Sequence, residues 1–104
     1  GGPRVQILHP GAVDALDSHV YDTLLIAHSV LDEAKAQLVA GKLPAGAKDV
    51  LNTAGRGYNI LRGAWLTYRD ARDPEARSDL AALLLREEAS LTRLIEDVKK
   101  LGTR

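Results

Sequence analysis

Histidine and aspartate recur in the first third of the chain at the spacing of neighbours on a helix. The three histidines are His9, His19 and His28. His19 precedes Asp22 by three residues and His28 precedes Asp32 by four, so each pair is expected to meet on a helix surface. The nine positions between His19 and His28 place them about 180° apart on a helix, so they cannot share one metal ion within one chain. We therefore predict exposed His–Asp pairs rather than a metal or catalytic site.

Two other patterns that could carry chemistry are incomplete. The segment Gly55-Arg56-Gly57 is followed by Tyr58 instead of a Lys-Ser/Thr pair, and no strand is expected before it, so it does not match a phosphate-binding loop. Acidic pairs at positions 32–33, 87–88 and 96–97 lack the Glu-x-x-His motif of di-metal helical bundles. With no cysteine in the chain, the sequence predicts no catalytic residue, no cofactor and no metal. We do not expect an enzyme.

The second third of the chain is basic and contains most of the aromatic residues. Arg62, Arg69 and Arg72 are expected on nearly one face of a helix, where they either form a solvated face with salt-bridge partners or contact an anionic partner such as a phosphate backbone. Trp65 follows the apolar spacing of this helix and is expected in the core or at a helix–helix interface. Residues 1–46 have a net charge of −2 and residues 47–72 a net charge of +3.

Composition bounds the class of protein. The 104 residues include 14 basic and 14 acidic side chains, and a net charge of zero argues against a nucleic-acid module that acts alone. No apolar run approaches the length of a membrane span, and the lack of cysteine is compatible with a cytoplasmic protein, which we expect. The chain has no methionine, so Gly1-Gly2-Pro3 is interpreted as a cleavage scar on an excised fragment.

Apolar periodicity predicts an all-α fold. Residues 1–11 are expected to be a tag scar and linker or a short strand, and residues 12–104 a single helical domain. Within it, residues 12–40 and about 47–71 are predicted to form a long antiparallel hairpin, and residues 74–101 a third, C-terminal helix of the bundle. Three glycines in the second helix indicate close packing or a break near positions 55–57, and continuous periodicity favours close packing.

The third helix has an apolar seam with heptad-like spacing. Apolar side chains on more than one face of this helix indicate self-association, so we expect a homo-oligomer. Glu87 interrupts the seam, either as a carboxylate paired with an arginine or as a polar residue that fixes register. The predicted oligomer or partner interface comprises Leu84, Glu87, Leu91, Leu94, Val98, Leu101 and Trp65.

The segments LVAGKLP (38–44), KDVLNTA (48–54) and YNILRG (58–63) resemble the helical-hairpin region of bacteriophage small terminase subunits. The resemblance extends over about residues 19–72. In that family an upstream helix-turn-helix binds DNA, and the hairpin assembles subunits into a ring that serves DNA packaging. The chain lacks the upstream DNA-binding domain, so the resemblance does not predict DNA binding by these residues.

Two functions follow as expectations. The first is a non-catalytic oligomerisation module of a DNA-associated assembly, similar to a phage small terminase subunit. The second is a monomeric or dimeric helical adaptor or regulator that offers a groove to a partner helix. The stoichiometry in solution distinguishes them.

Overall fold

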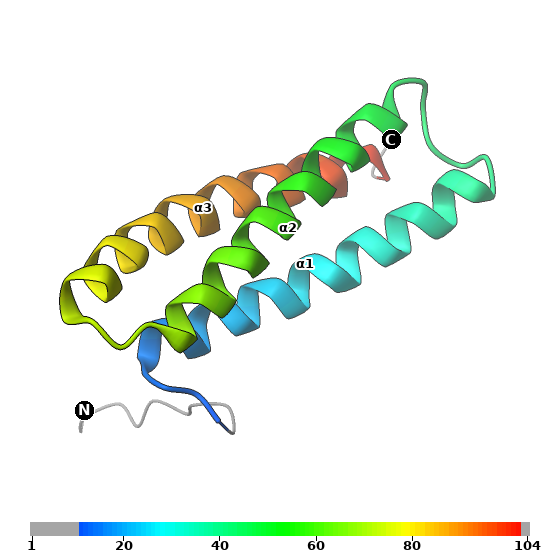
Figure 1. Cartoon of the computed structure of the whole chain (residues 1–104). Helices are drawn as coiled ribbons and strands as arrows, with labels where there is room; N and C mark the ends of the chain where they lie inside the picture. The colour runs from blue at the N-terminus through cyan, green and yellow to red at the C-terminus, as the bar shows by residue number, and fades with distance from the viewer. Residues whose placement is uncertain (1–10, 103–104) are drawn as a thin grey trace, which may run out of the picture.

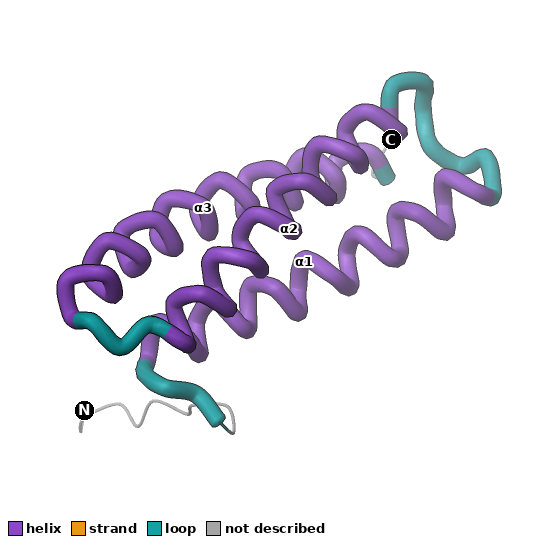
Figure 2. Tube along the Cα trace, viewed as in Figure 1, coloured by secondary structure: helices purple, strands orange, loops and turns teal. Residues whose placement is uncertain are grey.

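The computed structural model describes residues 11–102, which form a bundle of three helices. The helices are α1 (Ala15–Val39), α2 (Ala47–Asp70) and α3 (Pro74–Leu101), joined by short connections (Figures 1 and 2). No strand occurs in this range. The all-helical bundle predicted from periodicity is therefore confirmed, with helix ends within a few residues of those expected. The strand or scar predicted at the N-terminus and His9 lie outside the described residues, apart from Gly11.

Local sequence signals explain where the helices begin. The carboxylate of Asp14 accepts a hydrogen bond of 2.8 Å from the backbone N–H of Asp17 and so caps α1. The carboxylate of Asp73 caps α3 in the same way, at 2.9 Å from the N–H of Ala76, with Pro74 at the first helical position. Before α2, Gly46 has a φ of 88°, a conformation that favours glycine, and no side chain caps that helix.

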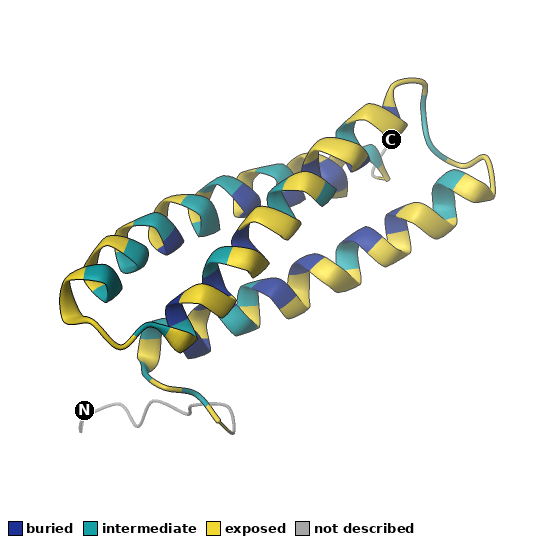
Figure 3. Ribbon diagram, in the orientation of Figure 1, coloured by how far each residue is buried: buried dark blue, intermediate teal, exposed yellow. Residues whose placement is uncertain are grey.

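The core lies where the three helices face one another, and each helix contacts both of the others. Figure 3 shows the buried positions on the inward faces and exposed positions on the outside. Leucine, alanine and valine dominate this core because their spacing of three and four residues keeps them on one side of each helix. The buried apolar residues include Val20, Leu24, Ala27, Leu31, Leu51, Ala54, Leu61, Trp65, Tyr68, Leu84, Leu91, Ile95 and Val98.

The close packing predicted at the three glycines of α2 occurs at only one of them, Gly57. A Cβ at Gly57 would lie 2.9 Å from Leu94 Cδ1 of α3, so a side chain there would push into the neighbouring helix. A Cβ at Gly55 or Gly63 would meet nothing within 4 Å. The helix is continuous through all three, so the alternative of a break near positions 55–57 is wrong.

Candidate functional site

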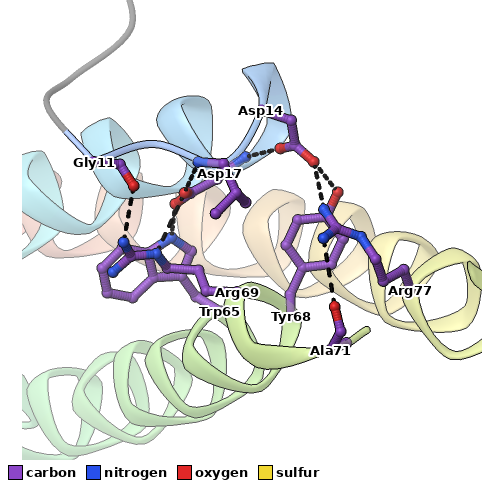
Figure 4. A network of polar contacts seen from close by, with 9 residues as sticks. Gly11, Asp14, Asp17, Trp65, Tyr68, Arg69, Ala71 and Arg77 are labelled. Atoms are coloured by element: carbon purple, nitrogen blue, oxygen red, sulfur yellow. Dashed lines mark hydrogen bonds and ion pairs between the residues drawn. The ribbon is translucent and has the colours of Figure 1, made fainter. Parts of the chain in front are cut away.

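Asp17 is a carboxylate buried inside the bundle, near the start of α1. Its side chain has no exposed surface and accepts hydrogen bonds from the indole N–H of Trp65 on α2 and, at 2.8 Å, from the backbone N–H of Val13. The guanidinium Nε of Arg69 lies 3.3 Å from Asp17 Oδ2, and its Nη2 donates to the carbonyl of Gly11 at 3.0 Å (Figure 4). A buried carboxylate is tolerated only with such partners.

Asp14 lies beside it and joins all three helices. Besides capping α1, it accepts a hydrogen bond from the hydroxyl of Tyr68 on α2 and one of 2.9 Å from Arg77 Nη2 on α3 (Figure 4). The guanidinium of Arg77 also lies over the Tyr68 ring, 4.7 Å from its centre, and donates to the carbonyl of Ala71 at 3.4 Å. We call the six side chains of this network the polar end: Asp14, Asp17, Trp65, Tyr68, Arg69 and Arg77.

The polar end shifts the acid–base equilibria of three of its members. Burial disfavours ionised Asp14, but hydrogen bonds from the Asp17 N–H and Tyr68 and the charge of Arg77 outweigh it, so its pKa lies below the ordinary 3.8. Burial and the hydrogen bond to Asp14 raise the pKa of Tyr68 above 10.0. The hydrogen bond with Tyr68 raises the pKa of Arg77 above its usual value. These shifts favour the ordinary charge state of each of the three groups near neutral pH, and the contacts that cause them join α1, α2 and α3.

A different kind of surface runs between α1 and α3. Two adjoining hollows of about 530 and 290 Å³ lie along it and share Lys99. We call this surface the α1–α3 groove, lined mainly by Thr23, Ile26, Ala27, Val30, Glu33, Ala34, Gln37, Glu88, Thr92, Ile95, Glu96, Val98 and Lys99. Its floor is apolar, and Ile26 on its rim is 59% exposed.

Glu88 is the centre of the polar contacts in this groove. Its Oε1 accepts hydrogen bonds from the hydroxyls of Thr23 at 3.0 Å and Thr92 at 3.3 Å. His19 Nε2 lies 3.3 Å from the same oxygen. The sequence predicted that His19 would pair with Asp22 on its own helix, but the histidine pairs with Glu88 of α3. His28 pairs as predicted, with its Nδ1 3.3 Å from Asp32 Oδ2.

Another hollow, of about 290 Å³, lies between α1 and α2. Tyr21 and Trp65 form one ring pair along it, with centroids 5.9 Å apart, and His28 and Tyr58 form a second at 6.0 Å. Arg62 is exposed and lines the same hollow.

The three arginines predicted on one face of the second helix have three different environments. Arg62 is exposed, whereas Arg69 is turned toward Asp17 and its side chain is 33% exposed. Arg72 follows the end of α2 and is exposed in the connection to α3, so it does not belong to a face of that helix. The predicted face is wrong for Arg72, because the helix ends before it, whereas Arg62 and Arg69 lie two turns apart on one side of α2. Contact of these residues with an anionic partner stays a prediction.

The residues predicted at an oligomer interface lie largely inside one chain. Leu84 and Leu91 have no exposed surface, Val98 is 3% exposed and Trp65 is 8% exposed. Leu94, Leu101 and Glu87 are half-buried, and Glu87 Oε1 lies 3.9 Å from Arg86 Nε. As folded, the four buried side chains offer no surface to a second copy, so their interface role stays a prediction that requires the bundle to open.

The sequence did not reveal the polar end. Acidic residues such as Asp14 and Asp17 at the start of a helix are ordinarily explained by the helix dipole alone. The lone tryptophan and the acidic first turn were the available signals, but the 48 residues between Asp17 and Trp65 hide their contact.

Residues 11–102 contain no group of three or more side chains placed to hold a metal ion. None of the helices in this range is long and apolar enough to cross a membrane. Comparison of the chain with protein-family models, with curated proteins and with solved structures found no match.

Proposed function

We propose that this chain is a non-catalytic helical adaptor that binds another protein through a groove on its surface. One observation carries the proposal. The three helices complete a core within one chain, while a large apolar side chain stays exposed beside each of two hollows: Ile26 at 59% and Leu25 at 53%. Exposed apolar side chains beside a hollow are what a helical partner needs for docking.

The polar groups support a non-catalytic role. The buried carboxylate Asp17 is held by hydrogen bonds and by Arg69, and Asp14 is held by Tyr68 and Arg77. Groups that are fully engaged in this way hold helices together and are not available to transfer protons. We place this function in the cytoplasm, as expected from the cysteine-free sequence.

A homo-oligomeric assembly module, similar to a phage small terminase subunit, is the second candidate. It is supported by the opposite charges of α1, with four acidic residues and one lysine, and α2, with four basic residues and two aspartates. In this reading α1 and α2 form the antiparallel hairpin predicted from the sequence, and α1 of one copy faces α2 of the next. Within one chain, contact between Asp14 at the start of α1 and Tyr68 near the end of α2 supports the antiparallel hairpin.

The absolute mass in solution, measured by light scattering at low and high salt, separates the two candidates. The adaptor is expected at the mass of one chain, 11.2 kDa, at both salt concentrations. A discrete multimer that dissociates at high salt would overturn the adaptor and favour assembly through the charged helices, because salt screens exposed charge pairs.

A further inference from the structure

The α1–α3 groove combines an apolar floor with an excess of negative charge. Ala27, Ile95 and Val98 are buried beneath it, and Ile26 stands on its rim. Three carboxylates line it, those of Glu33, Glu88 and Glu96, against the single ammonium of Lys99. With histidine neutral, the lining therefore has a net charge of −2 (one positive minus three negative).

Part of this negative charge is exposed, since the Glu96 side chain is 57% exposed and the Glu88 side chain 17% exposed. Glu88 uses one oxygen, Oε1, for its contacts with Thr23, Thr92 and His19, and its Oε2 has no hydrogen bond or ion pair within residues 11–102. Glu96 is 57% exposed and pairs with Lys99 at 3.2 Å, an exposed pair that contributes little and can exchange partners. A cation from outside can therefore bind both carboxylates without leaving a buried group unpaired.

From this charge and shape we infer that the α1–α3 groove binds a basic amphipathic helix of another protein. The groove follows α1 from Thr23 to Gln37, about 21 Å, which matches a helix of about 14 residues. The apolar side chains of that helix, spaced by three and four residues, lie against Ile26 and Ile95. Its lysines or arginines face Glu88 and Glu96. This inference rests on the adaptor function proposed above and names its partner class.

The hollow between α1 and α2 provides an internal comparison. Its volume of about 290 Å³ matches that of the smaller hollow of the groove, and Leu25 on its rim is 53% exposed against 59% for Ile26. Its lining contains Arg62 and no carboxylate. A basic helix is therefore repelled there by Arg62 and attracted to the α1–α3 groove. The two surfaces separate the effect of charge from the effect of exposed apolar area.

The test titrates the full chain with two synthetic helical peptides of about 14 residues. Both have leucine at the same positions, and they differ only in having lysine or glutamate at the others. Binding is followed by amide NMR shifts and by calorimetry. We expect the lysine peptide to shift the amide resonances of Ile26, Glu88 and Ile95 and to bind more weakly at high salt. It should bind at least about tenfold more tightly than the glutamate peptide.

Two surface variants locate the binding. Ile26→Lys is expected to weaken binding of the lysine peptide at least about tenfold. Leu25→Lys, at a matched exposed position of the other hollow, is expected to weaken it less than about twofold. Because both side chains are exposed, neither variant should unfold the chain, which circular dichroism checks. Equal losses of affinity in the two variants, or equal affinity for both peptides, would overturn the assignment of basic-helix binding to the α1–α3 groove. The proposed adaptor function would not be contradicted by either result. Binding of neither peptide would overturn the adaptor function as well.

Discussion

The polar end and the α1–α3 groove both place acidic residues between helices, but they use them differently. At the polar end, Asp17 has no exposed surface, and Asp14 is bound by groups from all three helices. In the groove, the contacts of Glu88 all go to one of its oxygens, and Glu96 is largely exposed. The first arrangement holds the helices together, and the second leaves negative charge beside apolar surface for a partner.

This difference shows that an acidic residue on a helical bundle cannot be assigned a role from its type. What decides is whether the neighbouring helices supply enough donors to engage both carboxylate oxygens. Substitutions in the two regions should therefore differ in size of effect, with large losses of stability at the polar end and small losses in the groove.

The largest loss is expected for Asp17→Ala. The substitution leaves the indole N–H of Trp65 and the N–H of Val13 without their buried acceptor and the Arg69 guanidinium without its counter-ion, so the free energy of unfolding should fall by about 3 kcal/mol. Urea unfolding measures it. The matched control is Asp32→Ala, where the carboxylate is 62% exposed, with an expected change under about 0.5 kcal/mol. Equal effects of the two would contradict a structural role for the polar end.

The second-largest loss of stability is expected at low pH, where the contacts of Asp14 at the polar end weaken. Because the folded-state pKa of Asp14 is depressed, its contribution to stability is present above its ordinary pKa of 3.8 and is lost as the pH falls through the lower folded value. Tyr68→Phe should cost about 1 kcal/mol at neutral pH by removing one of the hydrogen bonds that depress this pKa. It should also make the free energy of unfolding fall less steeply as the pH decreases. Urea unfolding between pH 2 and 7 checks this, and identical slopes in both proteins would refute it.

The smallest effect is expected in the groove, for Glu88→Gln. Glutamine keeps an oxygen that accepts from Thr23 and Thr92, so the free energy of unfolding should change by less than about 0.5 kcal/mol. Asp17→Asn, the same change at the polar end, should cost more than about 1.5 kcal/mol because charged hydrogen bonds are lost and the new amide N–H groups face donors. If Glu88→Gln costs as much, the groove carboxylate has a structural role too.

The elements of the fold could be predicted because their signals are local. Asp73 and Pro74 mark the start of α3 within two residues, and the apolar spacing of each helix selects its inward face. The leucine seam of α3 was assigned to contacts between copies, since a heptad-like spacing is the same for a helix that packs within one chain and for one that packs on another. Leu84 and Leu91 are buried by the chain's own α1 and α2.

The contacts between helices could not be predicted from spacing. Pairs such as Asp17–Trp65 and His19–Glu88 join residues far apart in the sequence, and they depend on how the helices are rotated against one another. The pair His28–Asp32 was predicted correctly because both residues lie on one helix, four positions apart.

The central claim, a core completed within one chain, is tested most directly by the dependence of the melting temperature on protein concentration. A chain that buries Leu84, Leu91 and Val98 in its own bundle should melt at the same temperature across a hundredfold range of concentration, because unfolding then involves one molecule. A melting temperature that rises steadily with concentration would show that a second copy completes the core, and would contradict the account.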